Sequence, residues 1–468
     1  MKLRVEVVWE SDEGEEQRSN MMAIDRPQLA METLGLNLGE SKAMLEGVQD
    51  IVVAQQVAED LERRRRCPNC GERYRGKGGG AKEVKTLFGM VEVANPRWKR
   101  CRCQQSGAKT FRPTVSWLQG QTTPELLYLE TKWASLIPFG KVADFLREVL
   151  PVDAGTNHET IRRHLHETAE RMENELGDER QLKLFAEEVA EPEDLASPDG
   201  PMTVGIDGGF VRAAHKEGFF EVIAGRSVVA FRREANDEVP EAKCFGYVQT
   251  YDEKPRRRLW ELMKSQGLRD HQQVVFMSDG GEDVRRVQAY MQPGSEHWID
   301  WFHITMRVTV LQQQTKTLMA EAGRAETGTA TAKRIDSVKH LIWHGNVAEA
   351  LDRLHDLLQD LDLIRAHSVA AEKLAHGMTE FEIYIRNNRE FVPNFGERYR
   401  QGETITTAFV ESTINQVVSR RVVKKQQMAW TLRGAHLLLQ TRTKVLNNEL
   451  ENVFRSWYPQ FRAEPKAA

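Results

Sequence analysis

This chain of 468 residues has no long apolar runs and no large excess of positive or negative charge. No stretch of 18 consecutive apolar residues occurs, so we expect no membrane span. The start, MKLRVEVVWESDEGEE, lacks the basic flank and apolar stretch of a signal peptide. The formal net charge is only -4, so the average charge does not indicate a nucleic-acid partner. These absences predict a cytoplasmic protein with no membrane partner.

Cysteine is also scarce, with five in the whole chain. Four of them form two close pairs, Cys67-Pro-Asn-Cys70 and Cys101-Arg-Cys103. In a chain without a secretion signal, such clustering favours a metal site over disulfides. Four thiolates suit tetrahedral Zn²⁺, although the second pair has a gap of one residue and not the usual two. A redox pair is the alternative, but no thioredoxin-like context surrounds Cys67.

The segment between the cysteine pairs predicts how they meet. The stretch KTLFGMVEVANPRWKRCRC alternates apolar and polar residues around a Phe-Gly turn, which indicates a hairpin. We therefore expect a zinc-ribbon-like module in which structural zinc holds a segment too short to form its own core.

The length of the chain predicts two to four domains. Changes in composition and periodicity suggest the following order: a strand and helix region (1–62), the zinc-ribbon-like module (63–120), a helical region (121–186), an acidic linker (187–202), the first part of an α/β core (203–301), a helical insertion (302–403) and the second part of the core with a basic C-terminal region (404–468).

The helical region has helix-turn-helix proportions between 140 and 172, with a turn longer than usual. If it binds DNA, Arg162, Arg163 and His166 would face the major groove. The alternative is ordinary helix packing, because any all-helical stretch can imitate this pattern.

Two aspartates of the α/β core share one local pattern. Asp207 and Asp279 each end a short apolar strand and are each followed by two glycines, and Glu411 begins a later helix. Carboxylates that converge at one sheet edge repel each other unless divalent cations lie between them, and Mg²⁺ prefers oxygen ligands. Two such ions can activate a water or a 3′-hydroxyl for phosphodiester displacement. Taken singly, each aspartate would more often be a turn residue.

Four motifs carry a resemblance to a known family. GIDGGFVR, MSDGGEDVR, WIDWFHITMR and FVESTINQVVSRRVVKKQQMAWTLRGAHLLLQTRTKVLN resemble motifs of bacterial insertion-sequence transposases of the ISKra-four family, across about 200–456. The resemblance implies an RNase H-like core whose DDE triad is Asp207, Asp279 and Glu411, with Mg²⁺ or Mn²⁺ as catalytic cofactor. The gap of 411 - 279 = 132 residues then contains the helical insertion.

The third motif contains Asp300 and His303, which resemble an Asp-x-x-His motif of related transposases. The resemblance implies that they brace the active site or contact DNA near the scissile bond. A buried, hydrogen-bonded pair that supports the sheet is an equal alternative.

The fourth motif is basic: residues 411–450 hold seven Lys and Arg against two Glu, 7 - 2 = +5. Phosphate contacts from such side chains carry much of DNA affinity. If one α-helix continued from Glu411, Arg421 and Lys425 would lie within about 80° of it. We therefore expect Arg420, Arg421, Lys424 and Lys425 to bind DNA.

Together these features predict a DNA transposase that cleaves insertion-sequence ends and transfers the 3′-hydroxyl into target DNA. Its partners would be double-stranded terminal inverted repeats and target DNA, and a homo-oligomer would pair two ends close to the bacterial nucleoid. Two alternatives stay open: a structure-specific nuclease of the same fold, and a transposase-derived DNA-binding regulator.

Overall fold

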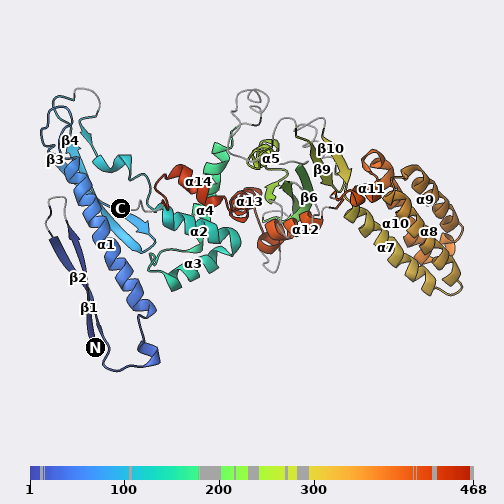
Figure 1. Ribbon diagram of the computed structural model, residues 1–468, viewed down its shortest axis with the longest axis horizontal. Helices are drawn as coiled ribbons and strands as arrows, with labels where there is room; N and C mark the ends of the chain where they lie inside the picture. The colour runs from blue at the N-terminus through green and yellow to red at the C-terminus, as the bar shows by residue number, and fades with distance from the viewer. Residues whose placement is uncertain are drawn as a thin grey trace. The chain divides into compact units, whose positions relative to one another are not determined.

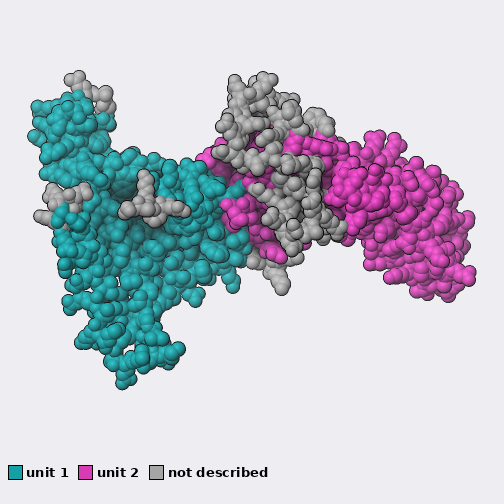
Figure 2. Space-filling view, viewed as in Figure 1, with its two compact units in different colours: residues 1–168, 449–468 teal, residues 169–448 magenta. Residues whose placement is uncertain are grey.

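The computed structural model describes residues 1–10, 14, 16–104, 108–177, 179, 202–214, 218–229, 242–268, 272–281, 295–403, 405–406, 408–423 and 429–463 (Figure 1). These fall into two compact units, Met1–Thr168 with Glu449–Ala468, and Ala169–Asn448 (Figure 2). The predicted linker 187–202 lies outside the described residues except for Met202, and so do Lys424 and Lys425.

The first unit begins with two small antiparallel sheets and one long helix. Strands β1 (Lys2–Glu10) and β2 (Glu16–Asp25) form a hairpin, and a 3₁₀ turn η1 (Met31–Thr33) precedes α1 (Leu38–Arg63). A capping box between Asn37 and Glu40 starts α1, because each side chain accepts from the backbone N–H of the other residue.

The second small sheet lies against α1. Strands β3 (Gly76–Thr86), β4 (Gly89–Lys99) and β5 (Thr110–Phe111) pair antiparallel, followed by η2 (Pro113–Ser116). Val57 of α1 packs against the inner side chains Val84, Val91 and Val93. The hairpin expected around the Phe-Gly turn is therefore present.

Three helices complete this unit, joined by the C-terminal segment. They are α2 (Pro124–Leu136), α3 (Phe139–Val149) and α4 (His158–Glu175), and the unit boundary falls within α4. Helix α14 (Leu450–Trp457) packs on α2, where Phe454 and Phe461 each lie 5.3 Å from the Tyr128 ring. The sequence had suggested that all of 404–468 belongs to the α/β core, whereas residues from Glu449 onward belong to the first unit.

The second unit is built around a mixed sheet. Its strands are β6 (Met202–Arg212), β7 (Phe219–Val229), β8 (Ala242–Val248), β9 (Val274–Ser278) and β10 (Glu296–Ile299), in the spatial order β10-β9-β6-β7-β8. The first three pair antiparallel, while β9 pairs parallel to β6 and β10 parallel to β9. The mixed α/β class expected from the sequence is confirmed.

Helices cover both faces of this sheet. On one face α5 (Pro255–Lys264) joins a core that includes Ile206, Ile223 and Phe245. On the other face α12 (Ala408–Ile414) and the π-helical segment η6 (Asn415–Val423) pack on β6 and β7. A Cβ added at Gly209 would lie 3.5 Å from Ile414, an ordinary van der Waals contact, so α12 covers this face of β6 at Gly209.

The outer strand β8 is protected by α13 (Leu432–Leu446) and the residue after it. The Asn447 amide accepts from the Cys244 N–H and donates to the Cys244 carbonyl, both at 2.8 Å, and Gln440 donates to the Gly246 carbonyl. These side chains satisfy backbone groups that an edge strand would otherwise expose.

The predicted helical insertion is an assembly of helices, in which α7, α8, α9 and α10 lie side by side (Figure 1). The elements are α7 (Trp301–Ala320), α8 (Ala325–Trp343), α9 (Val347–Asp362), η4 (Arg365–His367), α10 (Val369–Asn387), η5 (Arg389–Phe391) and α11 (Phe395–Arg400). The sequence predicts that the insertion begins at residue 302; in the structure β10 ends at Ile299 and the Asp300 side chain caps α7, which begins at Trp301.

Among the described residues, no helix is both long enough and apolar enough to span a membrane.

The cover of strand β8 generates a test. Asn447→Leu leaves the N–H and carbonyl of Cys244 without their amide partner, and we expect the free energy of unfolding to fall by about 2–4 kcal/mol. Denaturant titration measures this fall. The surface amide Gln359, which contacts only its own helix neighbour His355, provides the control Gln359→Leu, expected to change it by less than about 0.5 kcal/mol. Equal losses in both variants would contradict a special role for Asn447.

Candidate functional site

Three aspartates lie in one row across the parallel strands. Asp279 and Asp300 directly follow β9 and β10, whereas Asp207, expected to end its strand, lies inside β6, which continues to Arg212. In the β6–β9 pair Gly205 lies beside Met277, so the same register two residues on places Asp207 beside Asp279. In the β9–β10 pair Ile299 lies beside Ser278, which places Asp300 beside Asp279. Neighbouring strands are about 4.8 Å apart, so the register brings three carboxyl groups to one edge of the sheet.

The electrostatics of this row agree with the register. Burial raises the pKa of Asp207 above its ordinary value, and the charges of Asp279 and Asp300 raise it further. The His303 imidazole offsets part of this repulsion. Burial alone would lower the pKa of His303, but its hydrogen bond to Asp300 and the charges of all three aspartates raise it overall.

Asp300 and His303 form a supporting pair inside the row. Asp300 is fully buried, its backbone N–H donates to the Ser278 carbonyl, and its carboxylate accepts from the Phe302 N–H at 2.9 Å. Its other oxygen lies 2.9 Å from Nδ1 of His303. The contacts of Asp300 match the supporting alternative, and its hydrogen bond places the imidazole of His303 where the charges of Asp207 and Asp279 also raise the pKa of His303.

The structure places the backbone of Glu411 on α12, which packs on β6 and β7. Asp207 and Gly209 point to the same face of β6, since side chains alternate along a strand, and α12 covers that face at Gly209. The helix with Glu411 and the side chain of Asp207 therefore share one face of the sheet. The Glu411 side chain lies outside what the structure describes.

The basic segment after Glu411 differs from the expected α-helix. Residues Asn415–Val423 are π-helical, so the angles calculated for a regular α-helix do not apply. Arg442 donates to the carbonyls of Gln416 and Val417 and so satisfies backbone groups in this segment. Arg420 is exposed, as a DNA contact requires.

Arg421 occupies a different environment. It is only 2% exposed, and burial together with the charge of Arg442 lowers its pKa to about 10. Its guanidinium lies 5.4 Å from the centroid of the Trp430 ring. This buried position does not suit the expected surface contact with a phosphate, so we do not retain Arg421 as a DNA contact.

The three residues predicted to face the major groove lie on α4, and eight residues (150–157) separate α4 from α3. Arg162 and Arg163 are exposed, but they pair with Glu159 and Glu167 on the same helix, and His166 is half-buried. Contact of these three side chains with the major groove stays a prediction.

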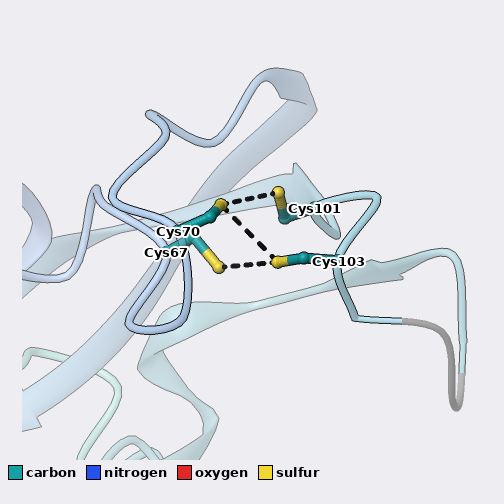
Figure 3. A group of neighbouring side chains, drawn as sticks. All are labelled: Cys67, Cys70, Cys101 and Cys103. Carbon is teal, nitrogen blue, oxygen red and sulfur yellow. Dashed lines mark hydrogen bonds between the residues drawn. The ribbon is translucent and has the colours of Figure 1, made fainter.

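The four clustered cysteines converge at one point (Figure 3). The Sγ atoms of Cys70 and Cys101 are 3.3 Å apart, and Cys103 Sγ lies 3.5 Å from those of both Cys67 and Cys70. In a tetrahedral site with Zn–S bonds of about 2.3 Å, sulfur atoms are about 3.8 Å apart. A small widening of the cluster therefore fits zinc.

The local backbone favours a thiolate at Cys67. Burial opposes ionisation there, but the N–H groups of Asn69 and Cys70 and the hydroxyl of Tyr74 lower the pKa of Cys67 to about 6. The turn closes at Gly71, whose φ of +73° favours glycine and whose N–H donates to the Cys67 carbonyl. Metal ligands must be deprotonated, and Cys67 meets this condition most readily. Hydrogen bonds with the other three thiols raise the pKa of Cys103, so a bound cation would be needed to ionise the whole cluster.

A basic face of the sheet β3–β4–β5 was not recognised from the sequence. Trp98 pairs with Gly76 and Phe111 and points into the core, so its strand neighbours point outward. The outward face carries five exposed cations across the three strands: Arg75, Lys77, Arg97, Lys99 and Arg112.

The whole segment 63–112 has the same bias, with 15 Lys and Arg against three Glu, or 15 - 3 = +12 in a chain of net charge -4. Like charges facing one another across strands are destabilising. Arg97 and Arg112 donate to Thr110 and to the Asn95 carbonyl, with no carboxylate partner in the described ranges. This face therefore suits an anionic partner.

A second group of possible metal ligands, Glu173, Asp252 and His436, already contains a cation. Their ligand atoms lie within 4.8 Å of one another. The buried Arg258 guanidinium donates to Glu173 at 2.8 and 3.0 Å and to Asp252 at 3.0 and 3.1 Å. A metal could bind here only by displacing this arginine, so we favour a structural ion-pair network.

Comparison with known proteins does not extend these observations, because no family model and no curated protein matches the chain.

The cysteine cluster predicts a zinc content. We expect about one zinc ion per chain in the purified protein, lost in Cys103→Ser, with a lower melting temperature for the variant. Elemental analysis and thermal melting measure both quantities. Cys244, which lies outside the cluster, provides the matched control Cys244→Ser, expected to keep its zinc. Full zinc content in Cys103→Ser would contradict the site.

The Arg258 network predicts a dependence of stability on pH. Burial opposes ionisation of Glu173, but His436 and Arg258 outweigh it and lower its pKa to about 2. Because the folded pKa lies below the unfolded value of about 4.3, this stabilisation is present above pH 4.3 and disappears as the pH falls toward 2. Glu173→Gln should therefore be less stable than the wild type at pH 6, with the difference shrinking below pH 4.

Chemical unfolding at several pH values measures this difference. Glu175→Gln, on the exposed side of the same helix, is the control and should track the wild type throughout. A Glu173→Gln deficit that stays constant down to pH 2 would contradict the assignment.

Proposed function

We propose that the protein is a DDE-type DNA transposase with an RNase H-like catalytic core. The observation that carries the proposal is the row Asp207–Asp279–Asp300 across three neighbouring parallel strands, on the sheet face that the helix with Glu411 covers. The motif resemblance supplies the activity, and the arrangement of the row supports it.

The sheet topology supports the same proposal. Three antiparallel strands followed by two parallel strands, in the order β10-β9-β6-β7-β8, match the strand order of the RNase H fold. Helices α7 to α11 fill the chain between β10 and α12, which is where the proposed insertion interrupts the core.

The residues of the row fit a divalent metal. Their carboxylate oxygens are the ligands that Mg²⁺ and Mn²⁺ prefer. Burial, and after it the charges of Asp279 and Asp300, raise the pKa of Asp207, and a bound cation would favour its ionised form. Bound metal would activate a water or 3′-hydroxyl and stabilise the leaving oxygen. Asp207 and Asp279 hold the metal in this proposal, and Glu411 completes the set.

The supporting residues have separate tasks. Asp300 fixes the start of α7 and orients His303, whose positive charge lies near the row. In this proposal the phosphate backbone of DNA is drawn toward the site by that charge, while Asp300 stays a structural residue.

DNA contacts outside the site come from the basic surfaces. In this proposal the basic face of β3–β4–β5, next to the cysteine cluster, and the exposed Arg420 each neutralise phosphates of the element ends. Arg162, Arg163, His166, Lys424 and Lys425 stay candidates for the same role. Double-stranded terminal repeats and target DNA are the proposed partners, and pairing of two ends requires a homo-oligomer.

The proposal is tested by cleavage of a labelled duplex that carries the element's own ends, with Mg²⁺ or Mn²⁺. Asp207→Asn and Asp279→Asn remove charge with little change in volume, and each should lower the cleavage rate by at least about 1000-fold while DNA binding stays within about threefold. Glu411→Gln should behave in the same way.

Asp336→Asn, an acid on α8 that contacts Gln312, is the matched control and should cleave at the wild-type rate. Cleavage without joining of ends to target DNA would favour the nuclease alternative. Specific binding without cleavage under either metal would contradict the transposase and favour the DNA-binding regulator.

A further inference from the structure

The helical insertion carries an arginine and a tyrosine beside the acidic row. Arg307 belongs to α7, one helical turn after His303, and Tyr384 belongs to α10. The Arg307 guanidinium carbon lies 4.2 Å from the centroid of the Tyr384 ring, which is within cation–π distance.

The hydroxyl of Tyr384 is buried and has no hydrogen-bond partner among the residues that the structure describes. It is close enough to the row that the charges of Asp279 and Asp300, added to the larger effect of burial, raise its pKa. The hydroxyl therefore keeps its proton at physiological pH and can donate. A buried donor without an acceptor costs about 1–3 kcal/mol, which is a reason to look for an acceptor that is supplied from outside the chain.

Arg307 provides the complementary charge. Its side chain is exposed, and among the described residues it has no carboxylate partner. The Tyr384 ring limits the directions that the guanidinium can take, so less freedom is lost when an anion binds.

A close contact fixes α10 against the chain segment that follows Asp279. Gly280 has a φ of +95°, and a Cβ there would lie 2.6 Å from the Oδ1 atom of Asn388. Asn388 in turn donates to the Tyr384 carbonyl at 2.8 Å. The position of Tyr384 relative to Asp279 is therefore set by packing in which only glycine fits at position 280.

We propose that Arg307 and Tyr384 form a phosphate clamp of the active site: Arg307 binds a phosphate of the DNA strand that enters the acidic row, and the Tyr384 hydroxyl donates to an oxygen of the scissile phosphate. This inference rests on the proposed function and assigns the helical insertion a direct part in substrate positioning. Arg307 acts mainly on binding, and Tyr384 acts mainly on the reacting phosphate.

The test separates these two roles. Duplex binding is measured between 50 and 200 mM salt without added divalent cation, and single-turnover cleavage is measured with Mg²⁺. Arg307→Ala should lower the slope of log affinity against log salt by about 0.9, and Arg307→Lys should restore it. Tyr384→Phe keeps the ring, so the slope should stay at the wild-type value while cleavage falls on the order of 100-fold.

Two further variants control for folding. Tyr384→Phe should melt at or above the wild-type temperature because it removes an unsatisfied hydroxyl, so loss of activity with retained stability distinguishes positioning from a structural role. Arg365→Ala, at an exposed arginine of η4 that pairs with Asp362, should change neither slope nor cleavage.

A wild-type slope in Arg307→Ala, or wild-type cleavage in Tyr384→Phe, would overturn the clamp while leaving the proposed function intact. If the wild type never cleaves, the proposed function fails, and the salt slope of Arg307→Ala still decides whether Arg307 binds a phosphate.

Discussion

The parallel register of β6, β9 and β10 is the constraint on which the site depends. It places Asp207, Asp279 and Asp300 side by side, although 72 residues separate Asp207 from Asp279 along the chain (279 - 207 = 72). Their mutual repulsion opposes folding, so the hydrogen bonds of the sheet and the cap on α7 must hold the row in place. A shift of one residue in the β6–β9 or the β9–β10 pairing would turn one carboxylate to the opposite face of the sheet, and the three aspartates would no longer lie together.

The elements around the row are arranged to preserve that register. Helix α12 covers β6 at Gly209, α13 closes the open edge at β8, and the contact of Gly280 with Asn388 ties the segment after Asp279 to α10. In the first unit, the basic face on β3–β5 brings like charges together next to a small core, and this repulsion lowers the stability of the sheet. The cysteine cluster at one end of that sheet fits a zinc ion that would supply the missing stability.

The sequence predicted features that depend on local patterns. The cysteine pairs, the Phe-Gly hairpin and the position of Asp279 after a strand follow from spacing of a few residues, and the structure shows the cysteines together. Asp207 was expected to end a strand in the same way but lies inside β6. Features that depend on pairing between distant segments were missed. Asp300 was given as the partner of His303, but its place in the row needed the β9–β10 register.

The other misses have the same origin. The basic face needed the strand pairing that aligns Arg75 with Lys99, and the Arg258 network needed four separate segments. Arg421 was placed near Glu411 on the assumption of a regular α-helix, but the segment Asn415–Val423 is π-helical. Backbone carbonyls of this segment accept hydrogen bonds from Arg442, which comes later in the chain. Residue types alone do not reveal such a backbone change.

The most direct test of the account is anomalous diffraction from crystals of the protein bound to its element-end duplex in Mn²⁺. The account predicts manganese peaks between the carboxylates of Asp207 and Asp279, with Glu411 as a further ligand, and a separate zinc peak among Cys67, Cys70, Cys101 and Cys103. A zinc peak at the cysteines with no manganese at the aspartates, in a complex with ordered DNA, would contradict the catalytic metal site.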